Sequence, residues 1–158
     1  MNLGTTIIGI LCVAICTMPF AVLSISKKRK EKRLINALKS LAEKQGCQLS
    51  EFEICGNYIV GIDKLKKGLF FQYSSQEKTE QQAIDLSTIQ ECNIHNISKR
   101  TAKDIKVQFL KLQLTPLDKA LGMINLDFYN ADISYMLRGE LQSIEKWKNI
   151  VYNSLVKR

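Results

Sequence analysis

Residues 3–26 contain no charged side chain, and this constrains the chain more than any other feature of its sequence. A helix rises ~1.5 Å per residue, so a stretch of this length can cross a hydrocarbon core of roughly 30 Å. The residues before it are not basic, and no small-x-small cleavage site ends it, which favours an anchor over a cleaved signal peptide. We therefore expect a single transmembrane helix within residues 1–26.

The next seven residues, 27–33, form a basic run of six basic side chains and one acidic one. Basic residues beside a membrane segment stay in the cytoplasm. We therefore expect a protein of the cell (inner) membrane, with its N-terminus outside and its C-terminal domain in the cytoplasm. The basic run supplies +5 of the formal net charge of +8. Attraction to anionic lipid explains this local charge better than nucleic acid does, and we expect no nucleic-acid partner.

Beyond the basic run, apolar residues recur at spacings of three and four over residues 34–42, as in an amphipathic helix. Gly46 is a natural stop for this helix. The expected organisation is therefore a transmembrane anchor (1–26), a basic juxtamembrane helix (27–46) and a soluble domain (47–158).

The soluble domain reads as a series of short strands followed by an amphipathic helix that carries Trp147. Polar stretches over 74–82 and 98–103 indicate loops. The apolar series changes phase near Phe109, which predicts a β-bulge or a strand that passes between two faces. The predicted strands are 48–54, 57–63, 69–73, 83–86, 89–97, 105–114 and 123–129.

This order of elements resembles the pleckstrin-homology-like domain, and in particular its bacterial membrane-associated members. The segments that carry the resemblance are 58–63, 69–71, 84–89 and the helix 140–155. The resemblance implies an α+β fold, in which mostly antiparallel strands form a partly open β-barrel or sandwich and the C-terminal helix plugs one end.

Lipid-binding members of this family carry basic residues in a loop between early strands. Lys64, Lys66 and Lys67 lie in such a loop, although the arginine of the eukaryotic phosphoinositide pattern is missing from the following strand. The alternative interpretation of the loop is an ordinary solvated turn.

No nucleotide-binding, hydrolase or metalloprotease motif occurs in the sequence. His95 is the single histidine, and the acidic residues are too scattered to select an acid–base pair. Cys47, Cys55 and Cys92 have no C-x-x-C spacing and are expected to be reduced thiols. We expect no catalytic residue, no metal and no cofactor, and therefore no enzyme.

Three functions are considered, and two of them are favoured over the third, an enzyme with an unrecognised site. The first is an interaction module, a membrane-tethered scaffold or adaptor that binds a protein partner or itself. The alternative is binding of anionic lipid headgroups at the membrane surface. The candidate lipid-binding residues are Lys27, Lys28, Arg29, Lys30, Lys32, Arg33, Lys64, Lys66 and Lys67.

Overall fold

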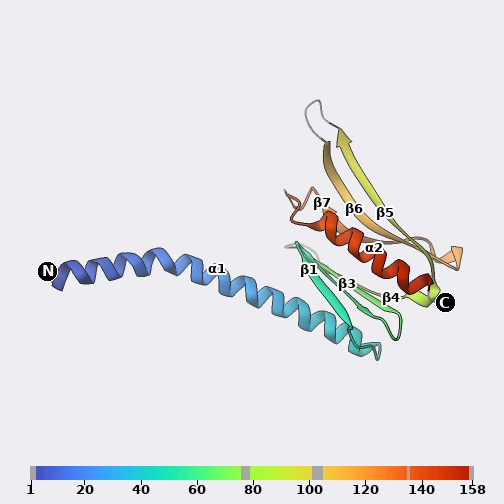
Figure 1. Ribbon diagram of the computed structural model, residues 1–158, viewed down its shortest axis with the longest axis horizontal. Helices are drawn as coiled ribbons and strands as arrows, with labels where there is room; N and C mark the ends of the chain where they lie inside the picture. Colours follow the sequence, from blue (N-terminus) through green and yellow to red (C-terminus); the bar gives the residue numbers. More distant parts are fainter. Residues whose placement is uncertain (1–2, 76–78, 101–104, 135, 157–158) are drawn as a thin grey trace. The chain divides into compact units, whose positions relative to one another are not determined.

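The computed structural model describes residues 3–75, 79–100, 105–134 and 136–156 (Figure 1). Within these ranges, the side chains at 3–6, 8–10, 14, 17, 19–27, 105 and 156 lie outside the description. The chain divides into two compact units, Met1–Asn36 and Ala37–Arg158. We refer to Ala37–Arg158 as the folded unit.

A single α-helix, α1 (Leu3–Lys44), runs without interruption through 42 residues, including the basic run. It ends where Gly46 adopts a left-handed φ of 66°, a conformation that glycine takes without steric cost. The backbone N–H groups of Gln45 and Gly46 donate to carbonyls of the last helical turn. The predicted stop at Gly46 is therefore confirmed.

The predicted transmembrane anchor is wrong. A crossing needs about 20 consecutive, mainly apolar helical residues. No helix in the described part of the chain is long enough and apolar enough to meet that requirement.

The first sheet is an antiparallel meander of four strands in the order β1-β2-β3-β4. Each strand pairs with the next one in the chain, so the turns between them set the register. The strands are β1 (Glu51–Cys55), β2 (Tyr58–Asp63), β3 (Gly68–Ser74) and β4 (Thr79–Asp85).

The two central strands of this sheet, β2 and β3, are buried along nearly their whole length. On one face they are covered by the end of α1, where Leu38 and Ala42 are buried. Gly61 permits this contact, because a Cβ atom there would lie 2.9 Å from Cδ2 of Leu38. A side chain at position 61 would therefore force α1 away from β2.

The second sheet has three antiparallel strands in the order β5-β6-β7. Its strands are β5 (Ile89–Arg100), β6 (Ile105–Pro116) and β7 (Ile124–Asn130), with a short 3₁₀ helix, η2 (Lys119–Leu121), between the last two. The register between β5 and β6 shifts between Ile97 and Ser98, where Gln108 is the extra residue of β6, and this confirms the predicted bulge near Phe109. A second shift, at Leu110 and Lys111 of β6, leaves Phe128 as the extra residue of β7.

The C-terminal helix, α2 (Glu140–Val156), packs against the second sheet and completes the core. The aromatic rings of Tyr58, Phe71 and Phe128 contact one another within this core, with centroids 4.5–5.6 Å apart. One face of α2 faces this cluster and contributes Ile144, Trp147, Val151 and Leu155.

The fold is α+β with two antiparallel sheets, but the expected barrel is wrong because no closed barrel forms. Within the described residues, no strand of the first sheet pairs with a strand of the second. The 3₁₀ helix η1 (Leu86–Thr88) separates β4 from β5. Asp85 caps η1 by accepting a hydrogen bond from the backbone N–H of Ser87 at 2.8 Å. The chain thus leaves the first sheet before the second begins.

Two strands are longer than their sequence patterns predict. β4 begins at Thr79, within the stretch predicted as a loop over 74–82, and β5 continues to Arg100 rather than ending at residue 97. Both strands lie at sheet edges, where polar side chains face solvent and the strand pattern weakens. Residues 76–78 and 101–104, which cover most of the rest of the two predicted loops, lie outside the described residues.

Candidate cationic binding surfaces

The turn between β2 and β3, residues 64–67, carries the three predicted lysines and is here called the lysine turn. Asp63 organises it: its carboxylate accepts hydrogen bonds from the backbone N–H groups of Lys66 (3.0 Å), Gln48 (2.8 Å) and Leu65 (2.9 Å). These backbone donors, that of Lys66 first, hold the pKa of Asp63 below its ordinary value. Lys67 closes the turn with a left-handed φ of 54°.

The fold itself uses the lysines of this turn. Lys64 Nζ lies 2.9 Å from Oε2 of Glu51 on β1, and this hydrogen bond helps to lower the pKa of Glu51. Lys66 Nζ donates to the backbone carbonyl of Gly46 at the end of α1. Lys64 and Lys67 also line a cavity of about 310 Å³ against the C-terminal part of α2. The ammonium groups therefore tie the turn to its neighbours.

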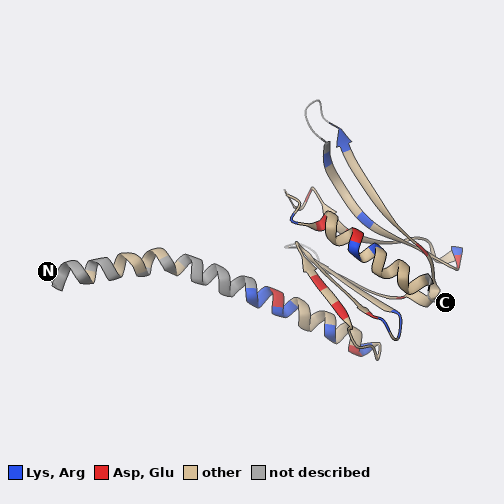
Figure 2. Cartoon of the chain, in the orientation of Figure 1, with Lys and Arg blue, Asp and Glu red and all other residues tan. Residues whose placement is uncertain are grey.

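The basic run lies on α1, with Lys28, Arg29, Lys30, Lys32 and Arg33 all exposed. Figure 2 shows these residues as an almost continuous blue segment of the helix. The side chain of Lys27 lies outside the described residues.

Earlier along α1, large apolar side chains are exposed to solvent. Ile7, Leu11, Ile15 and Met18 are each more than half exposed, at 53–70%. Their spacings of four, four and three residues place them on one face of the helix. Val13, which lies on the other side of the helix, is also 62% exposed. Along a single helix, the chain thus presents first an exposed apolar segment and then a cationic segment.

A second cationic segment lies at the outer end of the β5–β6 hairpin. Lys99 and Lys106 are Cα partners across the two strands, and Arg100 follows Lys99. All three side chains are exposed. Figure 2 shows basic residues in blue at the outer end of both strands. We call these three residues the hairpin end.

These two segments hold the whole formal net charge of the protein. Residues 27–33 carry +5 and residues 99–106 carry +3, out of a total of +8. Sequence reasoning missed the second segment because it treated the charge outside the basic run as nearly balanced. Counting charge in short windows along the chain would have found it.

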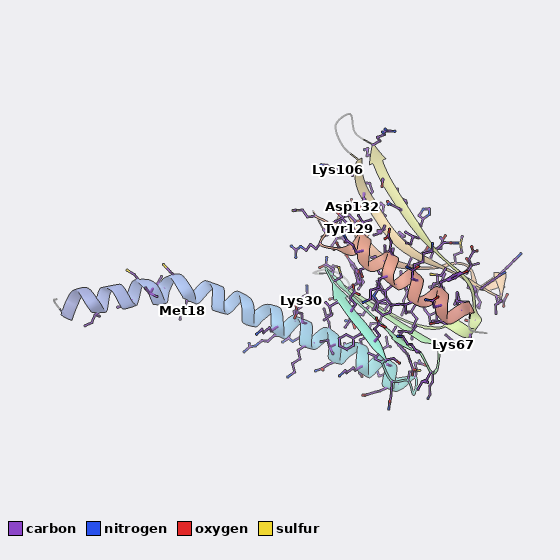
Figure 3. The ribbon with its side chains drawn as sticks, in the orientation of Figure 1. Met18, Lys30, Lys67, Lys106, Tyr129 and Asp132 are labelled. Atoms are coloured by element: carbon purple, nitrogen blue, oxygen red, sulfur yellow. The ribbon has the colours of Figure 1, made fainter. Side chains whose placement is uncertain are left out.

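The lysine turn and the hairpin end do not form one surface. Figure 3 places Lys67 and Lys106 at opposite ends of the folded unit. The predicted lipid-binding residues 64, 66 and 67 are therefore separated from the strongest positive charge of the folded unit.

A polar cluster joins β1 to α2. Lys146 Nζ lies 2.7 Å from Oε2 of Glu53 and 3.6 Å from Oε1 of Glu51. Tyr58 Oη, Ser143 Oγ and Trp147 Nε1 are buried without a hydrogen-bond partner among the described residues. Burial raises the pKa of Tyr58, which keeps its phenol neutral. The ion pairs of Lys146 with Glu51 and Glu53 hold the helix on the sheet.

His95 lies exposed on β5, with Lys111 as its Cα partner on β6. In the described part of the chain, no group of three histidine, cysteine, aspartate or glutamate residues is placed to hold a metal ion.

Comparison with protein-family models, curated proteins and solved structures returned no match. The resemblance to the pleckstrin-homology-like domain therefore stays a prediction. The expectations about activity, partners and cellular location stay predictions as well, so function is argued below from this chain's own residues.

Proposed function

We propose that this protein is a binding module that associates with anionic lipid headgroups at a membrane surface, without crossing the membrane. One observation carries the proposal: the basic run of α1 is exposed and follows an exposed apolar segment on the same helix. Anionic headgroups attract basic side chains, and the adjoining acyl chains accept apolar ones.

The energy of such an association comes from two sources. Each lysine or arginine near an anionic surface contributes about 1 kcal/mol, so the basic run can supply several kcal/mol. The apolar side chains at 7, 11, 15 and 18 add the free energy of leaving water. Because the Debye length is about 8 Å at physiological salt, the electrostatic part weakens as ionic strength rises.

The test is co-sedimentation of the full chain with vesicles of phosphatidylcholine alone and with vesicles of phosphatidylcholine and phosphatidylserine in equal amounts. We expect binding to the anionic vesicles that falls with added salt. A variant of the basic run should lose this binding, whereas the control K39Q/K44Q, which neutralises two lysines later on α1, should keep it. Equal binding to neutral and anionic vesicles would refute the proposal. The basic-run variant is K28Q/R29Q/K30Q/K32Q/R33Q.

The second candidate is an interaction module, a scaffold or adaptor. The four-four-three spacing of Ile7, Leu11, Ile15 and Met18 supports it, because such stripes also pack against a second helix. Sedimentation velocity of the full chain without vesicles separates the two candidates. Concentration-dependent self-association that is abolished by L11Q/I15Q, together with no preference for anionic vesicles, would favour this second function.

A further inference from the structure

The hairpin end carries an arrangement that costs energy in the isolated protein. Lys99 and Lys106 lie directly opposite each other in the antiparallel register. Like charges in that position destabilise the pairing of two strands. An anionic partner placed across the pair removes the repulsion.

The described residues offer these side chains no such partner. The side chains of Lys99, Arg100 and Lys106 form no ion pair or hydrogen bond in the described part of the chain. Asp127, on the same sheet, instead pairs with Lys111 at 3.1 Å. The positive charge of the hairpin end is therefore directed to solvent.

The hairpin end also stands clear of the core. The last buried residue of β5 is Cys92, and the first buried residue of β6 is Leu110. Beyond these residues the two strands form an arm that extends away from α2 (Figure 1). Its side chains can meet an extended surface without any rearrangement of the fold.

We propose that the hairpin end is a second contact with an anionic phospholipid surface, so that the folded unit adds its own contribution to binding. This rests on the proposed function and names a further site for it. The three residues supply exposed charge, and a fluid layer of headgroups requires only charge.

Other anionic partners fit the hairpin end less well. Residues 98–107 contain no aromatic side chain. Single-stranded nucleic acid is held largely by bases that stack on aromatic rings. Protein interfaces are anchored by a few large residues, with tryptophan and tyrosine prominent among them. The composition of the arm therefore favours lipid.

The experiment compares K99Q/R100Q/K106Q with the control K39Q/K44Q/K119Q in the full chain. Both variants remove three positive charges, but the control takes them from exposed positions outside both cationic segments. With vesicles of phosphatidylcholine and phosphatidylserine in equal amounts, we expect the hairpin variant to bind at least roughly tenfold more weakly than wild type. The control should bind within about twofold of wild type, because its charges lie away from the contact. Melting temperatures of both variants that are no lower than that of wild type show that the fold is intact.

The outcomes separate this inference from the proposed function. If wild type prefers anionic vesicles and the hairpin variant binds as tightly as the control, the inference is wrong and the proposed function stands. If wild type shows no such preference, the proposed function fails. If the hairpin variant loses binding only to polyglutamate or to DNA, the partner class is wrong and the inference is overturned.

Discussion

Replacing Leu38 by alanine tests whether the end of α1 belongs to the core of the folded unit. Leu38 is fully buried, and its Cδ2 lies against the backbone of β2 at Gly61. Truncating a buried leucine removes its transfer free energy and leaves a cavity, at a cost of about 2–5 kcal/mol. For a domain of this size, we expect the melting temperature to fall by roughly 10 °C.

Lys39→Ala is the matched control, because it creates the same residue one position later on the same helix, where the side chain is exposed. Its effect should stay within about 0.5 kcal/mol. Urea unfolding followed by the fluorescence of Trp147, the single tryptophan, gives both values. If the two variants unfold at the same urea concentration, Leu38 does not pack on β2 and the reasoning is refuted.

Gly61→Ala extends this test into a double-mutant cycle. Its new Cβ would lie 2.9 Å from Leu38, 3.0 Å from Leu49 and 3.2 Å from Phe52, so overpacking should cost about 1–3 kcal/mol. In the Leu38→Ala background the nearest of these contacts is gone, and the cost should fall by about 1 kcal/mol. Strictly additive effects would mean that the two residues do not touch.

Three further predictions concern single groups. Asp63→Asn should destabilise the protein by about 1–3 kcal/mol near neutral pH. Folding lowers the pKa of Asp63 below 3.8, so this stabilisation is present above pH 3.8 and is lost as the pH falls through the folded pKa. The free energies of unfolding of variant and wild type, measured in urea, should therefore converge in acid. Tyr58→Phe should leave the free energy of unfolding unchanged or raise it, since the buried hydroxyl has no hydrogen-bond partner among the described residues; a clear loss in urea unfolding would contradict this. Cys12 and Cys16 are exposed and should react with a thiol reagent in the folded protein, whereas Cys92, which is buried and has a pKa raised to about 12, should react only on unfolding; rapid labelling of Cys92 would contradict its burial.

The elements that sequence reasoning predicted correctly are those whose side chains follow a strict period. The phase change near Phe109 predicted the β6 bulge at Gln108, because one extra residue moves every later side chain to the opposite face. Apolar residues at spacings of three and four around Trp147 predicted α2, because that period places them on one face of a helix. The start of β4 was missed, because residues 79–82 of this edge strand are polar on both faces.

Sequence reasoning could not show features that depend on partners distant in the chain. The predicted anchor rested on the lack of charge over residues 3–26 and is wrong, because no described helix has the apolar length required. Lipid binding by the turn lysines stays a prediction. The contacts of Lys64 with Glu51 and of Lys66 with Gly46 exist only after β1, β2 and α1 have assembled. The Lys99–Lys106 pairing likewise requires the register of a hairpin.

The position of α2 in the chain has a consequence for synthesis. This 17-residue helix is translated after β1–β7, yet Trp147 and Ile144 lie fully buried in the core that those strands form. A ribosome adds roughly 5–20 residues per second, so the nascent strands keep an apolar face uncovered for about a second or more while α2 is made. A message truncated before the codon for Glu140 would yield only the uncovered form, which quality-control proteases and chaperones would recognise by its exposed apolar surface.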